Sequence, residues 1–211
     1  MSFRRADGNW AKQTSARFET ARPCLFLDRD GVLIEERNYL KDPELVEIIP
    51  GAVEAIAAAR RRGWAVTVVT NQSGVARGLI SWDQYEAVEQ RVADLLASQG
   101  AAADMVLACP YVQNGKPPYD RDDPWRKPGP GMLLEAGRAL NLDLSRSLLA
   151  GDRISDLQAA ERAGLRAVAH VMTGYGREER AGIRAQLQPA TRLFKVESIA
   201  ELPRIVDQMI D

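Results

Sequence analysis

The chain has 211 residues, of which 45% are hydrophobic and 27% charged, and its formal net charge is −1. This length suits one good-sized core, so we expect one domain over residues 1–211. The near-zero charge gives no general attraction to nucleic acid or to an anionic membrane, and we expect neither as a partner.

The first 22 residues contain basic side chains but no continuous apolar stretch. We therefore expect a partly ordered N-terminal arm over residues 1–22, and neither a secretion signal nor a membrane anchor. Cys24 and Cys109 are too few for a disulfide framework, and both adjoin apolar runs, which favours reduced, buried thiols. These features predict a cytoplasmic protein, and we expect it to be a monomer.

Short apolar runs alternate with longer segments of helical period. In chain order we predict a strand at 24–27, a helix at 51–62, a strand at 64–70, a helix between Ser81 and Gly100, a strand at 104–109, a helix at 131–140, a strand at 147–151, a helix at 155–164, a strand at 166–172 and a helix at 198–210. The apolar runs are continuous, which is typical of strands that are buried on both faces of a parallel sheet.

Two of the predicted helices begin with a possible capping box, at Ser81 with Gln84 and at Ser155 with Gln158. Pro203 interrupts the last helix early. Strands and helices that alternate with short connections predict an α/β fold: a doubly wound, mainly parallel sheet flanked by helices.

Polar side chains follow three of the predicted strands. Asp28 and Asp30 follow the first strand, Thr70 and Asn71 the second, and Asp152 the fourth. Ligands of open parallel sheets bind beyond the carboxyl ends of the strands, so these side chains are expected to meet at one edge. An Asp-Gly pair between apolar runs also signals a hairpin, but a bare hairpin would not explain polar residues at the other strand ends.

Three carboxylates at one edge repel one another unless a cation lies among them, and oxygen ligands of this kind suit Mg²⁺. A carboxylate beside a metal-bound phosphate is a competent nucleophile at phosphorus. Phosphoryl transfer also needs donors and cations around the transferred group. Thr70, Asn71, Arg126 and Lys127 are available for this task.

Four motifs resemble those of the haloacid dehalogenase (HAD) superfamily of phosphotransferases, in the same order. They are DRDGV from Asp28, TNQSG from Thr70, Lys127, and GDRISD from Gly151. The match covers roughly residues 24–174. It implies an aspartyl-phosphate mechanism in a phosphoric monoester hydrolase.

The resemblance assigns a role to each matched residue. Asp28 would be the nucleophile, and Asp30 the general acid and base. Asp28, the backbone carbonyl of Asp30 and Asp152 would ligate Mg²⁺. Thr70 would hold the transferred phosphoryl group, while Lys127 would pair with it and orient Asp28. Two aspartates are needed because the first attacks and the second must protonate the leaving oxygen.

Longer stretches look like the D-glycero-D-manno-heptose 1,7-bisphosphate phosphatases and the related histidinol-phosphate phosphatases, which carry no large cap domain. The stretches are DRDGVLIEERNYL, TNQSGVARG, RKPGPGML and GDRISDLQAAERAG. The resemblance implies a small phosphorylated metabolite as substrate, with a sugar bisphosphate first and histidinol phosphate as the alternative. A nucleic-acid 3′-end phosphatase and a non-catalytic HAD-like binding protein are alternatives of other classes.

The chain departs from this subgroup in one loop. The family typically has a zinc loop, Cys-x-His followed by Cys-x-Cys, before its Arg-Lys-Pro motif. Here Cys109 is kept, but Tyr111, Asp123 and Trp125 stand at the other three positions. A single thiolate cannot hold zinc tetrahedrally, so we expect no zinc.

Three further residues are candidates for a place at the site, and two of them, Arg77 and Asp156, have more than one interpretation. Arg77 follows the TNQSG motif and could bind a second anionic group, although exposed loop arginines are common. Arg126 is expected to touch the substrate, together with Tyr119 or Trp125. Asp156 could support the site from behind or could charge the first turn of its helix.

Overall fold

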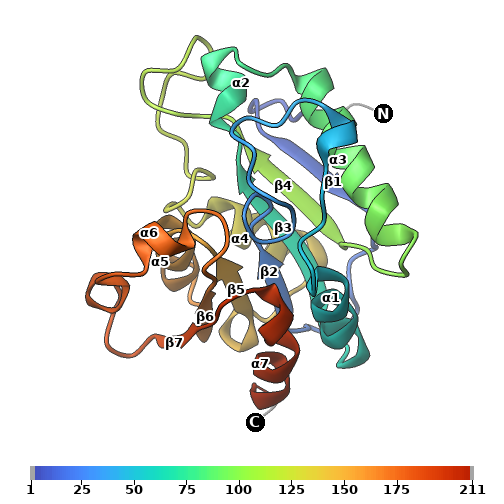
Figure 1. The fold of residues 1–211 in the computed structure, drawn as a ribbon, viewed down its shortest axis with the longest axis vertical. Coiled ribbons are helices and arrows are strands. Elements are labelled where there is room, and N and C mark those ends of the chain that lie inside the picture. The colour runs from blue at the N-terminus through green and yellow to red at the C-terminus, as the bar shows by residue number, and fades with distance from the viewer. Residues whose placement is uncertain (1–2, 210–211) are drawn as a thin grey trace.

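The structure is a computed structural model that describes residues 3–209. Seven strands form one sheet in the order β1-β4-β3-β2-β5-β6-β7 (Figure 1). All neighbouring strands are parallel except β1 and β4. The predicted doubly wound, mainly parallel sheet is therefore confirmed. Among the described residues, no helix has both the length and the apolar character needed to cross a membrane.

The strands are β1 Trp10–Gln13, β2 Cys24–Leu27, β3 Ala65–Asn71, β4 Met105–Cys109, β5 Leu148–Gly151, β6 Ala167–His170 and β7 Arg192–Lys195. The α-helices are α1 Ala52–Arg61, α2 Ser73–Arg77, α3 Trp82–Ala97, α4 Gly131–Leu140, α5 Ile154–Arg162, α6 Gly176–Glu179 and α7 Leu202–Gln208. Short 3₁₀ turns occur at Pro43–Leu45, Leu144–Arg146, Ile183–Gln186 and Ile199–Glu201.

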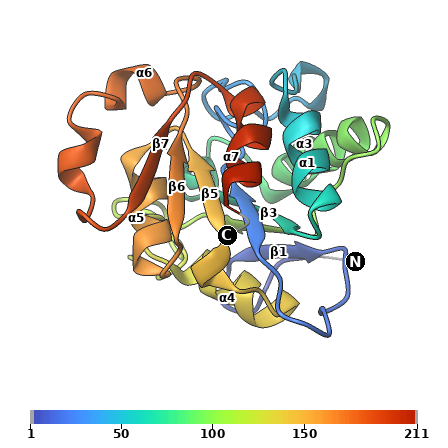
Figure 2. The same ribbon diagram turned by 90° about the horizontal axis from the view of Figure 1, so that it is seen from below.

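The sheet has a hydrophobic core on each face. In β2, Leu25 and Leu27 pack with residues of α1, α3 and α7. Cys24 and Phe26 point the other way and pack with residues of α4 and α5. Figure 2 shows α4 and α5 on the face of the sheet opposite to α1 and α7. Because successive strand residues face opposite sides, a continuous apolar run supplies both cores at once.

Helix starts follow local capping chemistry. The predicted box at α3 is present, because Ser81 Oγ accepts from the Gln84 amide at 3.1 Å and Gln84 Oε1 accepts from the Ser81 amide at 2.9 Å. The box predicted at Ser155 is wrong. Helix α5 begins at Ile154, and its first turn is capped by Asp156 instead, whose Oδ2 accepts from the Arg153 amide at 3.0 Å.

The last helix begins later than predicted. Helix α7 starts at Leu202, and Pro203 lies in its first turn, where a helix has no use for the missing N–H. The preceding residues form a 3₁₀ turn rather than the start of the helix. The predicted end at residue 210 lies outside the described residues.

The described part of the N-terminal arm contributes an edge strand. Residues 10–13 of β1 pair antiparallel with β4. Trp10 is 1% exposed, and its Nε1 donates to Glu86 Oε1 at 3.1 Å. The arm is thereby fixed to the same strand that leads into the altered loop.

Candidate active site

A cavity of about 380 Å³ opens at the carboxyl ends of β2, β3 and β5. Seven of the eight site residues predicted from the sequence line it, namely Asp28, Asp30, Thr70, Asn71, Arg126, Lys127 and Asp152. The remaining residue, Arg77, is exposed at the end of α2 and does not line this cavity. The strand-end argument therefore located the cavity, although Arg77 lies outside its wall.

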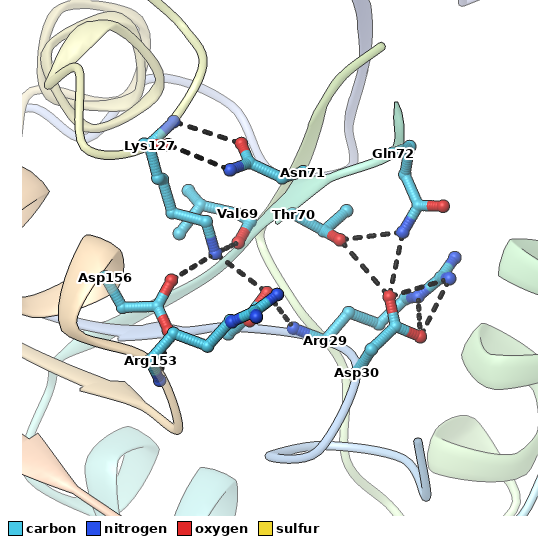
Figure 3. Close-up of polar contacts among 10 residues, drawn as sticks. Arg29, Asp30, Val69, Thr70, Asn71, Gln72, Lys127, Arg153 and Asp156 are labelled. Atoms are coloured by element: carbon cyan, nitrogen blue, oxygen red, sulfur yellow. Dashed lines mark hydrogen bonds and ion pairs between the residues drawn. The ribbon is translucent and has the colours of Figure 1, made fainter. Parts of the chain in front are cut away.

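Lys127 connects two buried carboxylates (Figure 3). Its Nζ lies 2.8 Å from Asp28 Oδ1 and 2.6 Å from Asp156 Oδ1. It also donates to the carbonyl oxygen of Val69 at 2.9 Å. Burial alone would lower the pKa of Lys127, but the charges of Asp156 and Asp28 outweigh it and hold the pKa above its ordinary value.

Asp156 has both of the roles that the sequence left open, because it supports the site from behind and also lies in the first turn of its helix. One of its oxygens pairs with Lys127, and the other caps the first turn of α5 at the Arg153 amide. These two contacts fix the carboxylate from opposite sides. Lys127 consequently has a buried partner besides Asp28.

Asp28, Asp152 and Asp156 each offer a carboxylate oxygen, and these oxygens lie within 4.8 Å of one another. Burial, followed by the charges of neighbouring carboxylates, raises the pKa of Asp152 to about 8. Burial also raises the pKa of Asp28 to about 7, against the opposing effect of Lys127. Such a cluster is stabilised by a bound cation.

Asp152 has one oxygen to spare. Its Oδ2 accepts from the Tyr175 amide at 2.8 Å, whereas its Oδ1 is buried and has no hydrogen-bond partner among residues 3–209. The backbones of Gly31 and Gly174, both at positive φ, lie close to this carboxylate. A Cβ at Gly31 would lie 2.6 Å from Asp152 Oδ2, and one at Gly174 would also collide with it. The geometry and the spare oxygen fit a hard cation.

Asp30 is held by donors on two sides. Arg29 donates to both of its oxygens, with distances of 2.9 to 3.1 Å. Gln72 Nε2 donates to Asp30 Oδ2 and to Thr70 Oγ1, in each case at 2.8 Å, and Thr70 Oγ1 lies 3.5 Å from Asp30 Oδ2. Figure 3 shows the side chains of Arg29, Gln72 and Thr70 converging on the Asp30 carboxylate.

Arg29 is itself buried, at 1% exposure. Its Nη1 lies 3.9 Å from Glu89 Oε2 on α3, and its guanidinium lies 5.2 Å from the centre of the Tyr85 ring. The sequence analysis singled out neither Arg29, which contacts Asp30, nor Glu89, which contacts Arg29. Arg29 stands between the two aspartates and could have been suspected from that place alone, but nothing in the sequence points to Glu89.

Asn71 has a structural contact as well as a place on the cavity wall. Its Nδ2 donates to the Lys127 carbonyl at 3.0 Å, and its Oδ1 accepts from the Lys127 amide at 3.0 Å. This double contact fixes the backbone that carries the lysine. Asn71 therefore links the end of β3 to the segment before α4.

Arg126 lines the cavity and donates from Nη1 to the Tyr111 carbonyl at 3.0 Å. Burial lowers its pKa, and the charges of Arg77 and Arg153 act in the same direction. Tyr119 and Trp125, expected beside it, do not line this cavity. They were wrongly placed because the loop turns their rings into an aromatic cluster and toward the N-terminal arm.

The rim of the cavity includes further residues that the sequence analysis did not single out. Arg153 lies 4.1 Å from the centre of the Tyr175 ring, and its Nε is 3.2 Å from Glu179 Oε1. Glu36 lies on the same cavity wall. Arg153 directly follows Asp152 and was detectable from that position, but Glu36, Tyr175 and Glu179 have no local signal in the sequence.

The chain is similar to proteins of known family. The family model described as HAD-hydrolase-like matches residues 124–202. A D-glycero-beta-D-manno-heptose-1,7-bisphosphate 7-phosphatase from Mesorhizobium japonicum is 49% identical over 160 residues, covering 75% of this chain and 74% of the relative. One from Pasteurella multocida is 35% identical over 185 residues, covering 88% and 97%.

A solved structure is similar over most of its length. The D,D-heptose 1,7-bisphosphate phosphatase from B. bronchiseptica, complexed with magnesium and phosphate, has a TM-score of 0.75 and 34% identity, covering 88% of this chain and 98% of that one. The fold and the matches define a HAD-like phosphatase, a phosphoric monoester hydrolase. Within this class, the chain belongs to the D-glycero-β-D-manno-heptose-1,7-bisphosphate 7-phosphatase family.

Proposed function

We propose that this chain hydrolyses the 7-phosphate of D-glycero-β-D-manno-heptose 1,7-bisphosphate with Asp28 as the nucleophile. The buried contact between Asp28 and Lys127 at the end of β2 is the observation that carries the mechanism. The names of the relatives from M. japonicum and P. multocida support the substrate. The cavity wall carries both acidic and basic side chains, which suits a phosphorylated sugar better than an apolar ligand.

Asp28 attacks through the oxygen that its partners leave unused. Lys127 Nζ and the Arg29 amide both contact Oδ1, at 2.8 and 2.7 Å. The Oδ2 atom can therefore form the bond to phosphorus while the bond from phosphorus to the sugar oxygen breaks. The Lys127 ammonium balances negative charge on the transferred group, and the Thr70 hydroxyl donates a hydrogen bond to it.

Asp30 handles the proton in both halves of the reaction. It protonates the departing sugar oxygen in the first half. In the second half it removes a proton from the water that hydrolyses the aspartyl-phosphate, which regenerates Asp28. Its contacts with Arg29 and Gln72 hold the carboxylate near the attacking residue during these steps.

Mg²⁺ is the proposed cofactor. Asp28, Asp152 and the backbone carbonyl of Asp30 would hold it, and the spare Oδ1 of Asp152 supports this assignment. When bound, the ion neutralises the phosphate and relieves the repulsion within the carboxylate cluster. Asp156, paired with Lys127, then serves to orient the lysine.

The test compares substrates with purified protein and Mg²⁺. We expect kcat/KM for the heptose 1,7-bisphosphate to exceed that for histidinol phosphate by roughly tenfold or more, because the second substrate lacks the polar sugar contacts. Phosphorus NMR should show that the 1-phosphate remains on the product. Faster turnover of histidinol phosphate, or release of the 1-phosphate, would contradict the proposal.

A further inference from the structure

The loop of residues 110–125 joins β4 to the cavity residues Arg126 and Lys127. Tyr111 and Trp125, at two of the family's zinc positions, are not zinc ligands. Burial raises the pKa of the Cys109 thiol to about 12, which opposes the thiolate form that zinc requires. The residues present therefore do not fit a tetrahedral zinc ion.

All three substituted positions contact one short N-terminal segment instead. This segment, residues 5–9, is called the latch below. The contacts pair Tyr111 with Asp7, Asp123 with Asn9, and Trp125 with Arg5. A different side chain at each former ligand position thus meets a different residue of the latch.

The contact of Tyr111 is the most enclosed. Its Oη donates to the Asp7 carbonyl at 2.5 Å and itself accepts from Arg121 Nη2 at 2.9 Å. The Arg121 guanidinium also lies 4.6 Å from the centre of the tyrosine ring. Gly8 makes this approach possible, because its φ is +88° and a Cβ there would collide with the tyrosine hydroxyl.

The other two contacts fix the far end of the loop. Asn9 Nδ2 donates to Asp123 Oδ1 at 3.3 Å, and the Trp125 amide donates to the same oxygen at 2.9 Å. The Arg5 guanidinium lies 5.0 Å from the centre of the Trp125 ring. Cation and aromatic ring at this separation attract each other.

The latch is anchored at its C-terminal end, where it leads into strand β1. The Arg5 amide donates to the Asn9 carbonyl at 2.8 Å, which closes a tight turn. Trp10 follows immediately, buried in the core and paired with Ala108 of β4. The latch therefore cannot shift without disturbing the edge strand.

We propose that residues 5–9 hold the 110–125 loop in place of a zinc ion and thereby position Arg126. The link is Tyr111, whose hydroxyl contacts the latch and whose carbonyl accepts from Arg126 Nη1 at 3.0 Å. Tyr111 and Asn9 are positioning residues, since neither lines the cavity. The assignment of Arg126 to the substrate rests on the proposed function.

The first test needs no substrate. Tyr111→Phe removes the hydroxyl and Asn9→Ala the amide, while Lys12→Ala is a matched control on the same arm, because Lys12 contacts Gln90 and Phe3. Hydrogen exchange of the 110–125 amides should accelerate roughly three- to tenfold in the first two variants, as one lost hydrogen bond allows, and not in the control. Unchanged exchange in both would overturn the latch, as would stoichiometric zinc in elemental analysis of the wild type.

The second test concerns Arg126. Tyr111→Phe should raise KM for the heptose bisphosphate roughly threefold or more, with kcat for an aryl phosphate changed by less than about twofold. In an Arg126→Ala background the same change should have no further effect on KM. Additive effects, or equal effects on both substrates, would overturn the positioning role. If the wild type does not hydrolyse the bisphosphate, the proposed function fails, while the exchange experiment still decides the latch.

Discussion

The ammonium group of Lys127 lies 2.8 Å from Oδ1 of Asp28, and both side chains are buried. The contact joins the end of β2 to the segment before α4, which are almost 100 residues apart in sequence. Because Asp156 shares the same ammonium, one cation compensates two buried carboxylates. The stability of the protein and its chemistry therefore depend on the same group.

Lys127→Ala should destabilise the fold as well as stop turnover. It leaves Asp28 and Asp156 buried without their cation, which costs on the order of 3–5 kcal/mol at neutral pH. Urea unfolding followed by circular dichroism measures the change. Lys41→Ala, at an exposed lysine, is the control and should alter the free energy of unfolding by less than about 0.5 kcal/mol. Equal stability of the two variants would contradict the interpretation of Lys127 as a compensating charge.

Asp28→Asn should abolish turnover of an aryl phosphate, by at least roughly a thousandfold in kcat, because an amide cannot attack phosphorus. The fold should remain, since the amide is nearly the same size as the carboxylate. Phosphate release gives the rate, and circular dichroism checks the fold. A rate close to that of the wild type would eliminate Asp28 as the nucleophile.

Asp30→Asn should impair turnover according to the leaving group. General acid catalysis contributes about 10²–10⁴-fold when the departing oxygen is a poor leaving group. An alkyl phosphate should therefore lose far more activity than a nitrophenyl phosphate, whose oxygen leaves without a proton. Comparable losses on both substrates would argue against an acid role for Asp30.

The fold was predictable from the sequence where a strand is buried on both faces, because such a strand is a continuous apolar run. Strands β2 and β5 lie between two hydrophobic cores, so their apolar runs are unbroken. The edge strands β1 and β7 have no continuous apolar run. They are less buried and keep polar residues such as Lys12 and Arg192. The sequence analysis consequently missed both.

The same limit applies to the site. Strand ends located Asp28, Asp30 and Asp152, because the carboxyl ends of parallel strands meet at one edge. Arg77 follows the TNQSG motif, yet the short helix α2 carries it to an exposed position outside the cavity. Glu89 is 60 residues from Arg29, and their contact depends on how α3 packs on the sheet. No local pattern connects two such positions.

Glu89 makes stability depend on pH. Burial raises its pKa from 4.5 to about 7, although Arg29 and Lys12 oppose the shift, while the charge of Asp30 adds to it. Between these two pH values the folded state keeps a proton that the unfolded state has lost. The free energy of unfolding therefore falls as the pH rises from about 4.5 to about 7, and the loss is complete above that range.

Glu89→Gln removes this dependence, because the amide stays neutral at every pH. We expect the variant and the wild type to melt at similar temperatures at pH 5. At pH 8 the variant should melt higher by roughly 6–12 °C, since a pKa shift of this size corresponds to about 3 kcal/mol. Calorimetry at both pH values, with excess Mg²⁺ to keep the carboxylate cluster in one state, measures the difference. Glu86→Gln, one turn earlier on α3, is the control. A Glu89→Gln variant that melts lower than the wild type at pH 8 would show that the pairing of Glu89 with Arg29 outweighs the cost of burying its charge.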